Sequence, residues 1–563
     1  MASLISSAVW LKRGVAKQHP QKYNLNQQEL ERISQLAGNR LTTLLKKEEV
    51  IDQEDEEWSD QHSSQEKDKM DLDEQTDEMV LYNLNDYDKE ESKAISMGAF
   101  SNIKGLQYYQ NPADDPYITL DDDADHDSQE REQLEIYPTD NLIITARTED
   151  DVSQLDVHVY DQGEENLYVH HDILLPAMPL CLEWIDFSPT GILCDDPTRK
   201  GNFIAVGTMD PEIEIWNLDL VEGLYPDAIL GNSTKPIDQQ VSDSNHPSTE
   251  TTKQNNNNKK KKKKKKKDNN NNNTAPLISP THHTSSVLSL SHNKLVRNLL
   301  LSASADSTIK LWDLNQGPTD NSSSTFSAIR SFSMHTDKVQ SAQWNPKEAS
   351  VILSGGWDRK LKVWDSRNAQ EGVEVQVESD VECLRWDTFN PKAFIVTLDN
   401  GLIQSFDSRM LSPFSTVKKL ESPKPLWTLA AHDSSVSAFD ISPTIPGLLI
   451  SGGLDKMVKV WNLEDKSGSP TLSMVVSRDL GVGKVFAVSF CPDDPTTVAV
   501  AGSKASLQIW DLATNNGVRS VFRDRFKQYA KLVDLDSRKP LGTDGVLAVR
   551  DDPDSEEEDE DDS

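Results

Sequence analysis

Three segments of the chain carry the same four polar or aromatic residues at the same spacing. Each segment begins with His, and Ser, Asp and Trp follow at the positions His+19, His+23 and His+29. The three sets are His283, Ser302, Asp306 and Trp312; His335, Ser354, Asp358 and Trp364; and His432, Ser451, Asp455 and Trp461. Because four chemically distinct residues recur without a gap, each segment must place these side chains in the same local structure.

This spacing is the WD-repeat pattern, and it predicts an all-β fold, a β-propeller with four strands in each blade. In such a blade the Asp accepts a hydrogen bond from the His, the His meets the Ser hydroxyl, and the Ser meets the indole N–H. Buried polar groups are costly unless they are paired, so the four partners fix one turn geometry. We therefore interpret these residues as structural, although His, Ser and Asp also form catalytic triads.

The number of blades follows from the aromatic residue that closes each repeat. These residues are Tyr160, Trp216, Trp312, Trp364, Phe406, Trp461 and Trp510. They predict a single seven-bladed propeller over residues 136–518, with six blades as the alternative. The longest interval between them, from Trp216 to Trp312, contains a Lys/Asn-rich insertion at 237–275 that we expect to be disordered. Four blades lack part of the polar set, and packing must hold them instead.

The remaining segments differ in composition from the propeller. We expect an N-terminal docking segment at 1–25 and an amphipathic helix at 26–47, which could dock a partner or pack on the propeller. Residues 48–91 contain 19 acidic residues and three lysines, so 48–135 is predicted to be an acidic, mostly disordered arm with short motifs. A basic extension at 519–550 and an acidic tail at 551–563 follow the propeller, and Ser555 in the tail precedes three glutamates that suit an acidophilic kinase.

The insertion contains nine consecutive lysines flanked by asparagine tracts. Adjacent ammonium groups repel and stay solvated, so the run is expected to bind polyanions. A nuclear or nucleolar import signal, a clamp on RNA or DNA phosphates, and attraction to the chain's own acidic arms are all compatible with it, and we favour the import signal. The lysines are Lys259, Lys260, Lys261, Lys262, Lys263, Lys264, Lys265, Lys266 and Lys267.

Two further groups of residues are candidates for binding. The basic extension suggests contact with RNA phosphates, with a solvated surface as the alternative. Its candidates are Arg519, Arg523, Arg525, Lys527 and Lys531. Residues just before the turn Asp of a WD repeat lie at one rim of the propeller, and a large aromatic there indicates a partner-binding hot spot. The rim candidates are Trp357, Lys338, Met209 and Leu454.

Catalysis is not expected. The sequence contains no P-loop, HExxH or GxSxG motif, and its four cysteines have no metal-ligand spacing, so we expect no cofactor, no metal and no small-molecule substrate. A hydrophobic fraction of 36% and a net charge of −35 fit one folded block with disordered arms. Because no apolar run reaches the length that a membrane span needs, we expect a soluble, intracellular chain without membrane contact.

Several stretches outside the repeat pattern resemble the periodic tryptophan protein 1 family. They lie at residues 8–14, 82–88, 114–120, 138–142, 155–160, 168–173 and 201–207, and the lysine run follows the second blade. The long asparagine tracts depart from the family. The resemblance implies a nucleolar WD-repeat protein of ribosome production, with ribosome-assembly factors and the precursor RNA of the large subunit as partners. It also implies a link to chromatin at ribosomal DNA, through which a histone reader would promote transcription.

Overall fold

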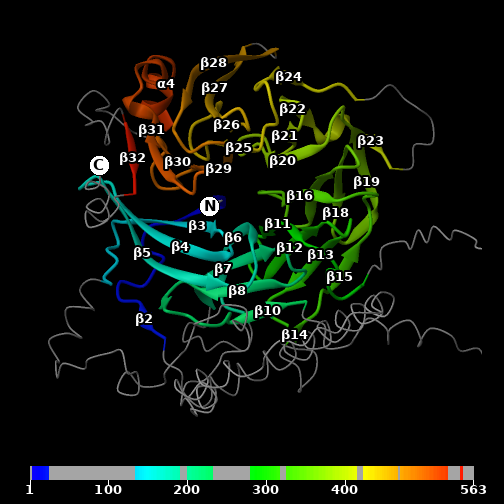
Figure 1. Cartoon of the computed structure of the whole chain (residues 1–563). Helices are drawn as coiled ribbons and strands as arrows, with labels where there is room; N and C mark the ends of the chain where they lie inside the picture. Colours follow the sequence, from blue (N-terminus) through cyan, green and yellow to red (C-terminus); the bar gives the residue numbers. More distant parts are fainter. Residues whose placement is uncertain are drawn as a thin grey trace, which may run out of the picture. The chain divides into compact units, whose positions relative to one another are not determined.

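A computed structural model describes residues 3–23, 134–189, 199–231, 279–316, 325–414, 423–466, 469–529 and 545–549. Within these ranges the strands form seven sheets of four or five strands and one two-stranded sheet. The seven larger sheets follow one another around a ring (Figure 1). The seven-bladed propeller expected from the sequence is therefore confirmed, and each closing aromatic lies on the third strand of its own blade.

The blades are numbered here in the order of their third strands along the chain. Blade 1 contains β1 (Ser3–Leu11), β3 (Asn141–Glu149), β4 (Val152–Asp161) and β5 (Asn166–Leu175). Blade 2 contains β6 (Pro179–Phe187), β7 (Lys200–Thr208), β8 (Ile213–Asn217), β10 (Ala228–Leu230) and β14 (Thr325–Phe326). Blade 3 contains β11 (Val287–His292), β12 (Leu299–Ser304), β13 (Ile309–Asp313) and β15 (Arg330–Phe332).

Blade 4 contains β16 (Val339–Trp344), β17 (Val351–Gly356), β18 (Lys360–Asp365), β19 (Asn368–Gln376) and β23 (Ser412–Pro413). Blade 5 contains β20 (Val381–Trp386), β21 (Ala393–Leu398), β22 (Leu402–Asp407) and β24 (Trp427–Ala430). Blade 6 contains β25 (Ala438–Ile441), β26 (Leu448–Gly452), β27 (Met457–Lys466) and β28 (Ser469–Asp479). Blade 7 contains β29 (Val485–Phe490), β30 (Thr497–Gly502), β31 (Leu507–Asp511) and β32 (Val546–Ala548).

Four short elements and one helix complete the described part. β2 (Gln21–Lys22) pairs in parallel with β9 (Leu220–Val221). Two short 3-10 helices are η5 (Ser408–Met410) and η6 (Leu512–Thr514), and the helix is α4 (Asn516–Tyr529).

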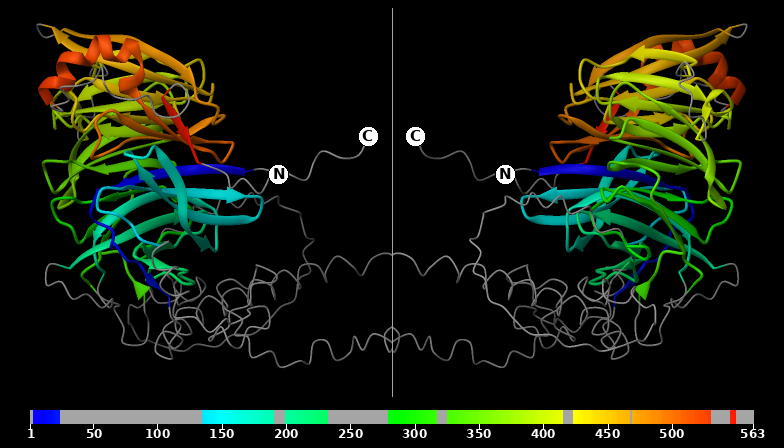
Figure 2. Two further views of the ribbon diagram at one scale, coloured as in Figure 1. Left: turned by 90° about the vertical axis from the view of Figure 1, so that its left-hand side faces the viewer. Right: turned by 90° about the vertical axis from the view of Figure 1, so that its right-hand side faces the viewer.

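The N-terminal segment differs from the expectation of a docking segment outside the propeller. β1 pairs antiparallel with β3 and is the innermost strand of blade 1, although the whole stretch 12–140 lies between the two strands in the sequence. Figure 2 shows this dark blue strand beside the cyan strands of the same blade. The Trp10 indole N–H donates to the Ser489 carbonyl of blade 7 at 3.1 Å, so the segment closes the ring between the first and last blades. The ring therefore begins at β1 and not at residue 136.

The C-terminal boundary also differs from the expectation, because the propeller does not end at residue 518. α4 buries Val518, Phe522 and Phe526 in an apolar cluster shared with blades 6 and 7. After the helix the chain returns as β32, which pairs with β31 as the outer strand of blade 7. The basic composition of this segment suggested a separate extension, but one face of the helix is apolar. Burial of that face stabilises the packing of α4 on the propeller.

The core lies between neighbouring blades. Each apolar cluster combines residues of two adjacent sheets, as when Ile5, Trp10 and Tyr160 of blade 1 pack with Ala499 and Ile509 of blade 7. Because the ring is closed, every sheet packs against a neighbour on both sides. The propeller is therefore a rigid support for the loops at both ends of the channel. The expected helix at 26–47, the acidic arm, the insertion at 237–275 and the acidic tail lie outside the described residues.

Candidate functional site

The structure brings together the four residues of each predicted set. In blade 3 the indole Nε1–H of Trp312 donates to Ser302 Oγ at 2.8 Å, and Ser302 Oγ is 2.7 Å from His283 Nε2. His283 Nδ1 lies 2.9 Å from a carboxylate oxygen of Asp306. The sets of His335 and His432 repeat this order, with Ser–His distances of 2.9 and 2.8 Å and Trp–Ser distances of 3.2 and 2.9 Å.

The protonation states of these sets follow from burial. Burial lowers the pKa of His283, and its neighbour Asp306 opposes that effect through a hydrogen bond. Burial alone would raise the pKa of the Asp306 carboxyl, but hydrogen bonds from His283 and Thr308 hold it well below its usual range. A neutral His283 then donates a hydrogen bond from Nδ1–H to Asp306 and accepts one at Nε2 from the Ser302 hydroxyl. Every donor in the set therefore has an acceptor.

This hydrogen-bond order is the same as in a Ser-His-Asp triad, but the surroundings differ. Ser302, Ser354 and Ser451 have no exposed surface, and an indole N–H already binds each hydroxyl oxygen. A substrate carbonyl could not approach these oxygens. The arrangement fixes the turn between the second and third strands and does not supply a nucleophile.

The other blades replace the set with different contacts. In blade 1 Thr145 Oγ1 lies 3.0 Å from His158 Nε2, and in blade 2 the Trp216 indole N–H donates to the Glu214 carboxylate at 3.2 Å. The Trp510 indole of blade 7 is buried and has no hydrogen-bond partner among the described residues. Packing alone holds Trp510, as the incomplete pattern of the last repeat implied.

The rim candidates occupy equivalent positions in three blades. The backbone N–H of Met209, Trp357 and Leu454 donates to the carbonyl of Met178, Lys338 and Ser435, respectively, just before the inner strand of each blade. Trp357 is 40% exposed and Met209 is 54% exposed, whereas Leu454 is half-buried. The Lys338 ammonium lies 4.5 Å from the centroid of the Trp357 ring, a cation–π contact that holds the indole in place at the surface.

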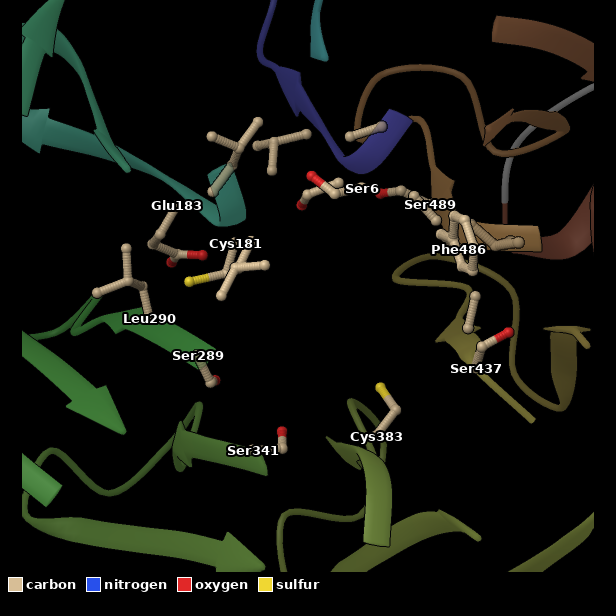
Figure 3. A pocket seen from close by; sticks show the side chains of 18 of the residues that line it. Ser6, Cys181, Glu183, Ser289, Leu290, Ser341, Cys383, Ser437, Phe486 and Ser489 are labelled. Atoms are coloured by element: carbon tan, nitrogen blue, oxygen red, sulfur yellow. The ribbon is translucent and has the colours of Figure 1, made fainter. Parts of the chain in front are cut away.

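A central channel, as expected for a propeller, runs through the ring, but the residues that line it were not predicted from the sequence. It has a volume of about 720 Å³, and residues of all seven inner strands or their immediate approaches line it. Figure 3 shows Ser6, Ser437 and Phe486 around one part of this space, and Cys181, Ser341 and Cys383 around another. Three of the four cysteines lie in the described residues as free thiols, and two of them, Cys181 and Cys383, line the channel.

The inner strands share a repeated irregularity at one end of the channel. Six inner strands contain a register shift near their start, and the extra residue lines the channel. These residues are Ser6, Leu180, Leu288, Gln340, Glu382 and Phe486, and Ser437 holds the equivalent place in blade 6. A β-bulge re-aims a side chain, and here it turns one side chain per blade toward the channel. No composition signal marks these positions, but three of them, Leu288, Gln340 and Ser437, lie five residues after the His of their repeat, and counting from that His would have found these three.

Glu382 is the ionisable residue among these seven channel-lining positions. Burial, together with the neighbouring carboxylates of Asp399 and Asp380, raises the pKa of Glu382 to about 7. Gln340 lies two positions after Lys338, and the Lys338 carbonyl accepts the Trp357 backbone N–H. The seven channel-lining positions and Trp357 therefore lie at the same end of the channel. This end combines an exposed aromatic, a lysine and a carboxyl group with a raised pKa.

The basic candidates of the C-terminal segment are not equivalent. Arg525 donates to the Pro446 carbonyl at 3.0 Å, lies 3.4 Å from the Glu464 carboxylate and stacks on Phe522. These contacts make Arg525 a bridge between α4 and blade 6, in contrast to the expected phosphate contact. Arg519 donates to Asn516 on its own helix, and Arg523 and Lys527 are exposed. Lys531 and the lysine run Lys259–Lys267 lie outside the described residues.

No group of three or more His, Cys, Asp or Glu side chains in the described residues is arranged to hold a metal ion. None of the helices in the described ranges is long and apolar enough to cross a membrane.

Comparison with known proteins gives matches over part and over nearly all of the chain. The family described as "WD domain, G-beta repeat" matches residues 275–313, 326–365 and 423–462. An uncharacterised WD repeat-containing protein of Schizosaccharomyces pombe is 39% identical over 95% of both chains. Periodic tryptophan protein 1 of Saccharomyces cerevisiae is 35% identical over 99% of this chain and 98% of its own length. The Drosophila melanogaster homologue of that protein is 27% identical over 92% and 96%.

Other similar proteins match only part of the chain. A ribosome biogenesis protein WDR12 homologue of Trichoplax adhaerens is 26% identical over 40% of this chain and 52% of its own. Histone acetyltransferase type B subunit 2 of Candida glabrata is 25% identical over 42% and 54%.

Proposed function

The chain belongs to the periodic tryptophan protein 1 family, and we propose that it is a non-catalytic scaffold of ribosome biogenesis. In this proposal it assists assembly of the large ribosomal subunit and processing of its precursor RNA in the nucleolus. The observation that carries the proposal is the full-length similarity, 35% identity over 99% of the chain, to a protein of this family. The partial similarity to a ribosome biogenesis protein agrees with it.

The geometry supports a scaffold because the His, Ser and Asp side chains that resemble a catalytic triad are buried and already paired. Their serine hydroxyls are inaccessible to a substrate. What the ring exposes instead is a set of rigid loops. Exposed aromatic residues next to a cation are typical of protein-binding hot spots, so we assign Trp357 and Lys338 to a partner-binding rim.

Contact with RNA would use charge and not base sequence. On α4 the exposed Arg523 and Lys527 remain candidates, and the lysine run would add nine charges. Arg525 is excluded from this role because it bridges the helix and Glu464. Phosphate binding of this kind predicts a steep salt dependence of RNA affinity that becomes shallower when the lysine run is deleted.

Crosslinking of the tagged full-length protein to RNA in cells, followed by sequencing of the attached RNA, tests the proposal. We expect reads on the spacers or on the large-subunit part of the precursor RNA. The same protein with Arg523→Ala and Lys527→Ala should give fewer reads, and an Arg478→Ala variant in blade 6 is the control for loss of positive charge. An absence of crosslinked RNA would refute direct contact with the precursor.

A chromatin-associated histone reader at ribosomal DNA is the second candidate. The partial similarity to a histone acetyltransferase subunit favours it, and so does the combination of Trp357 with the Glu382 carboxyl at one channel end. This function predicts binding to a histone peptide that survives RNase treatment and is lost in Glu382→Gln. Binding that disappears with RNase would instead favour the scaffold on precursor RNA.

A further inference from the structure

Three neighbouring loops lie at the channel end opposite to Trp357, and the first and third of them expose large apolar side chains. They connect the first and second strands of blades 3, 4 and 5 and span residues 293–298, 345–350 and 387–392. Leu295 is 52% exposed, Val296 38% and Phe389 46%. Single exposed apolar residues are ordinary on a protein surface, but these lie on either side of the blade 4 loop, which exposes Lys347. We call these three connections the loop arc.

Each loop of the arc is held in one conformation by the side chain that begins it. Asn293 Oδ1 accepts the backbone N–H groups of Leu295 and Val296 at 3.0 and 2.9 Å. Asp387 Oδ1 accepts that of Phe389 at 2.9 Å. Asn345 Oδ1 does the same for Lys347 in blade 4 at 2.9 Å. The apolar side chains therefore project from fixed turns.

The loops are also connected to one another. Asn293 Nδ2 donates to the Ala349 carbonyl of the next loop at 2.8 Å, and Asn345 Nδ2 donates to the Pro391 carbonyl at 2.7 Å. A continuous set of hydrogen bonds thus runs from Leu295 in blade 3 to Phe389 in blade 5. Binding to preordered loops costs less conformational entropy than binding to flexible ones, so the arc is suited to recognise a partner.

The charge of the arc is opposite to that of the chain. Each loop exposes one lysine, Lys294, Lys347 and Lys392, and the one exposed acidic residue in these three loops is Glu348. Lys294 lies 3.5 Å from Glu183, whereas Lys347 and Lys392 form no ion pair with a described residue. The exposed lysines of the three loops would attract an acidic partner.

We propose that the loop arc binds an acidic segment of a partner protein that lies across the three loops, with apolar side chains against Leu295 and Val296 at one end and Phe389 at the other. Aliphatic side chains and lysines favour a protein over RNA, because base stacking uses aromatic rings and arginine planes, and Phe389 is the single aromatic residue exposed in these loops. The surface is separate from the Trp357 rim, so the proposal does not depend on the function assigned to that rim.

Fluorescence anisotropy with the full-length protein tests the proposal. The probes are labelled 12-residue peptides that combine Asp and Glu with two Leu or Phe residues at several spacings, the same peptides with Lys in place of the acids, and a 12-nucleotide uridine RNA. We expect at least one acidic peptide to bind about tenfold more tightly than its Lys counterpart. Leu295→Ser with Phe389→Ser, and Lys347→Glu with Lys392→Glu, should each weaken that binding about tenfold or more.

Two control variants separate this surface from general effects. Met474→Ser removes an equally exposed apolar residue from blade 6, and Lys456→Glu reverses a charge at the Trp357 end, so neither should change the affinity. The proposal is overturned if no acidic peptide binds better than its Lys counterpart, or if the double variants bind it as well as the controls do. RNA binding that the same variants abolish would identify the arc as an RNA surface and would also overturn it.

Discussion

Replacement of Ser302 by Ala tests whether the buried hydrogen bonds stabilise the blade. Ser302 has no exposed surface, accepts the Trp312 indole N–H at 2.8 Å and lies 2.7 Å from His283 Nε2. Alanine leaves both partners buried and unpaired. Each such group costs about 1–3 kcal/mol, so we expect Ser302→Ala to lower the free energy of unfolding by about 2–5 kcal/mol.

Hydrogen exchange measured on peptides from blade 3 is the assay, because it reports local opening without requiring the whole ring to unfold in one step. A loss of about 2–5 kcal/mol corresponds to a rise in the opening constant of about 30-fold to several thousand-fold. Ser520→Ala on the exposed face of α4 is the matched control, and it should change protection by less than about 0.5 kcal/mol.

A double-variant cycle adds a second criterion. If Ser302 acts through His283, then Ser302→Ala should cost less in a His283→Ala background than in the natural chain, because the lost hydrogen bond is already broken. Equal costs in both backgrounds, or a single-variant effect no larger than that of Ser520→Ala, would refute the structural role of the set.

Three other predictions follow from particular contacts. Trp10→Ala should destabilise the ring by about 3–5 kcal/mol, because it leaves a cavity beside Tyr160 and removes the hydrogen bond to the Ser489 carbonyl. A lower midpoint of urea unfolding and faster proteolysis of blade 1 would show this loss. Burial lowers the pKa of His158 to about 4 and of His171 to about 3, whereas both have a pKa near 6.5 in the unfolded chain. The contribution of these neutral histidines to stability is therefore full above pH 6.5 and falls as the pH drops toward 4. His158→Gln should reduce this loss in acid unfolding curves, and an unchanged slope would contradict the prediction. Trp357→Ala should remove a subset of the co-purifying proteins without changing the melting temperature, whereas Met474→Ala should leave all of them bound. If both variants co-purify with the same proteins, the assignment of Trp357 to a partner-binding rim is wrong.

The sequence predicted the blades best where local residues determine their structure. The spacing of His335, Ser354, Asp358 and Trp364 is set within one blade, so it is visible in one segment of the chain. The closing aromatics gave the number of blades because each lies on the third strand of its own blade, even where the polar set is missing, as at Phe406.

Pairings between distant segments could not be predicted in this way. β1 joins β3 across the intervening stretch 12–140, and β32 returns to β31 after α4, and neither pairing has a local signal. The role of Arg525 was missed because composition does not show which side chain of a basic helix faces Glu464. The loop arc was missed because the hydrogen bonds of Asn293 to Ala349 and of Asn345 to Pro391 join loops of three successive blades that lie far apart in the sequence.

Sedimentation of the tagged full-length protein through a sucrose gradient, with and without RNase, tests the scaffold proposal most directly. The proposal predicts that the protein sediments with precursor particles of the large ribosomal subunit and moves to the top of the gradient after RNase treatment. Protein that stays at the top without RNase, or that follows chromatin in both conditions, would contradict a role in assembling that subunit.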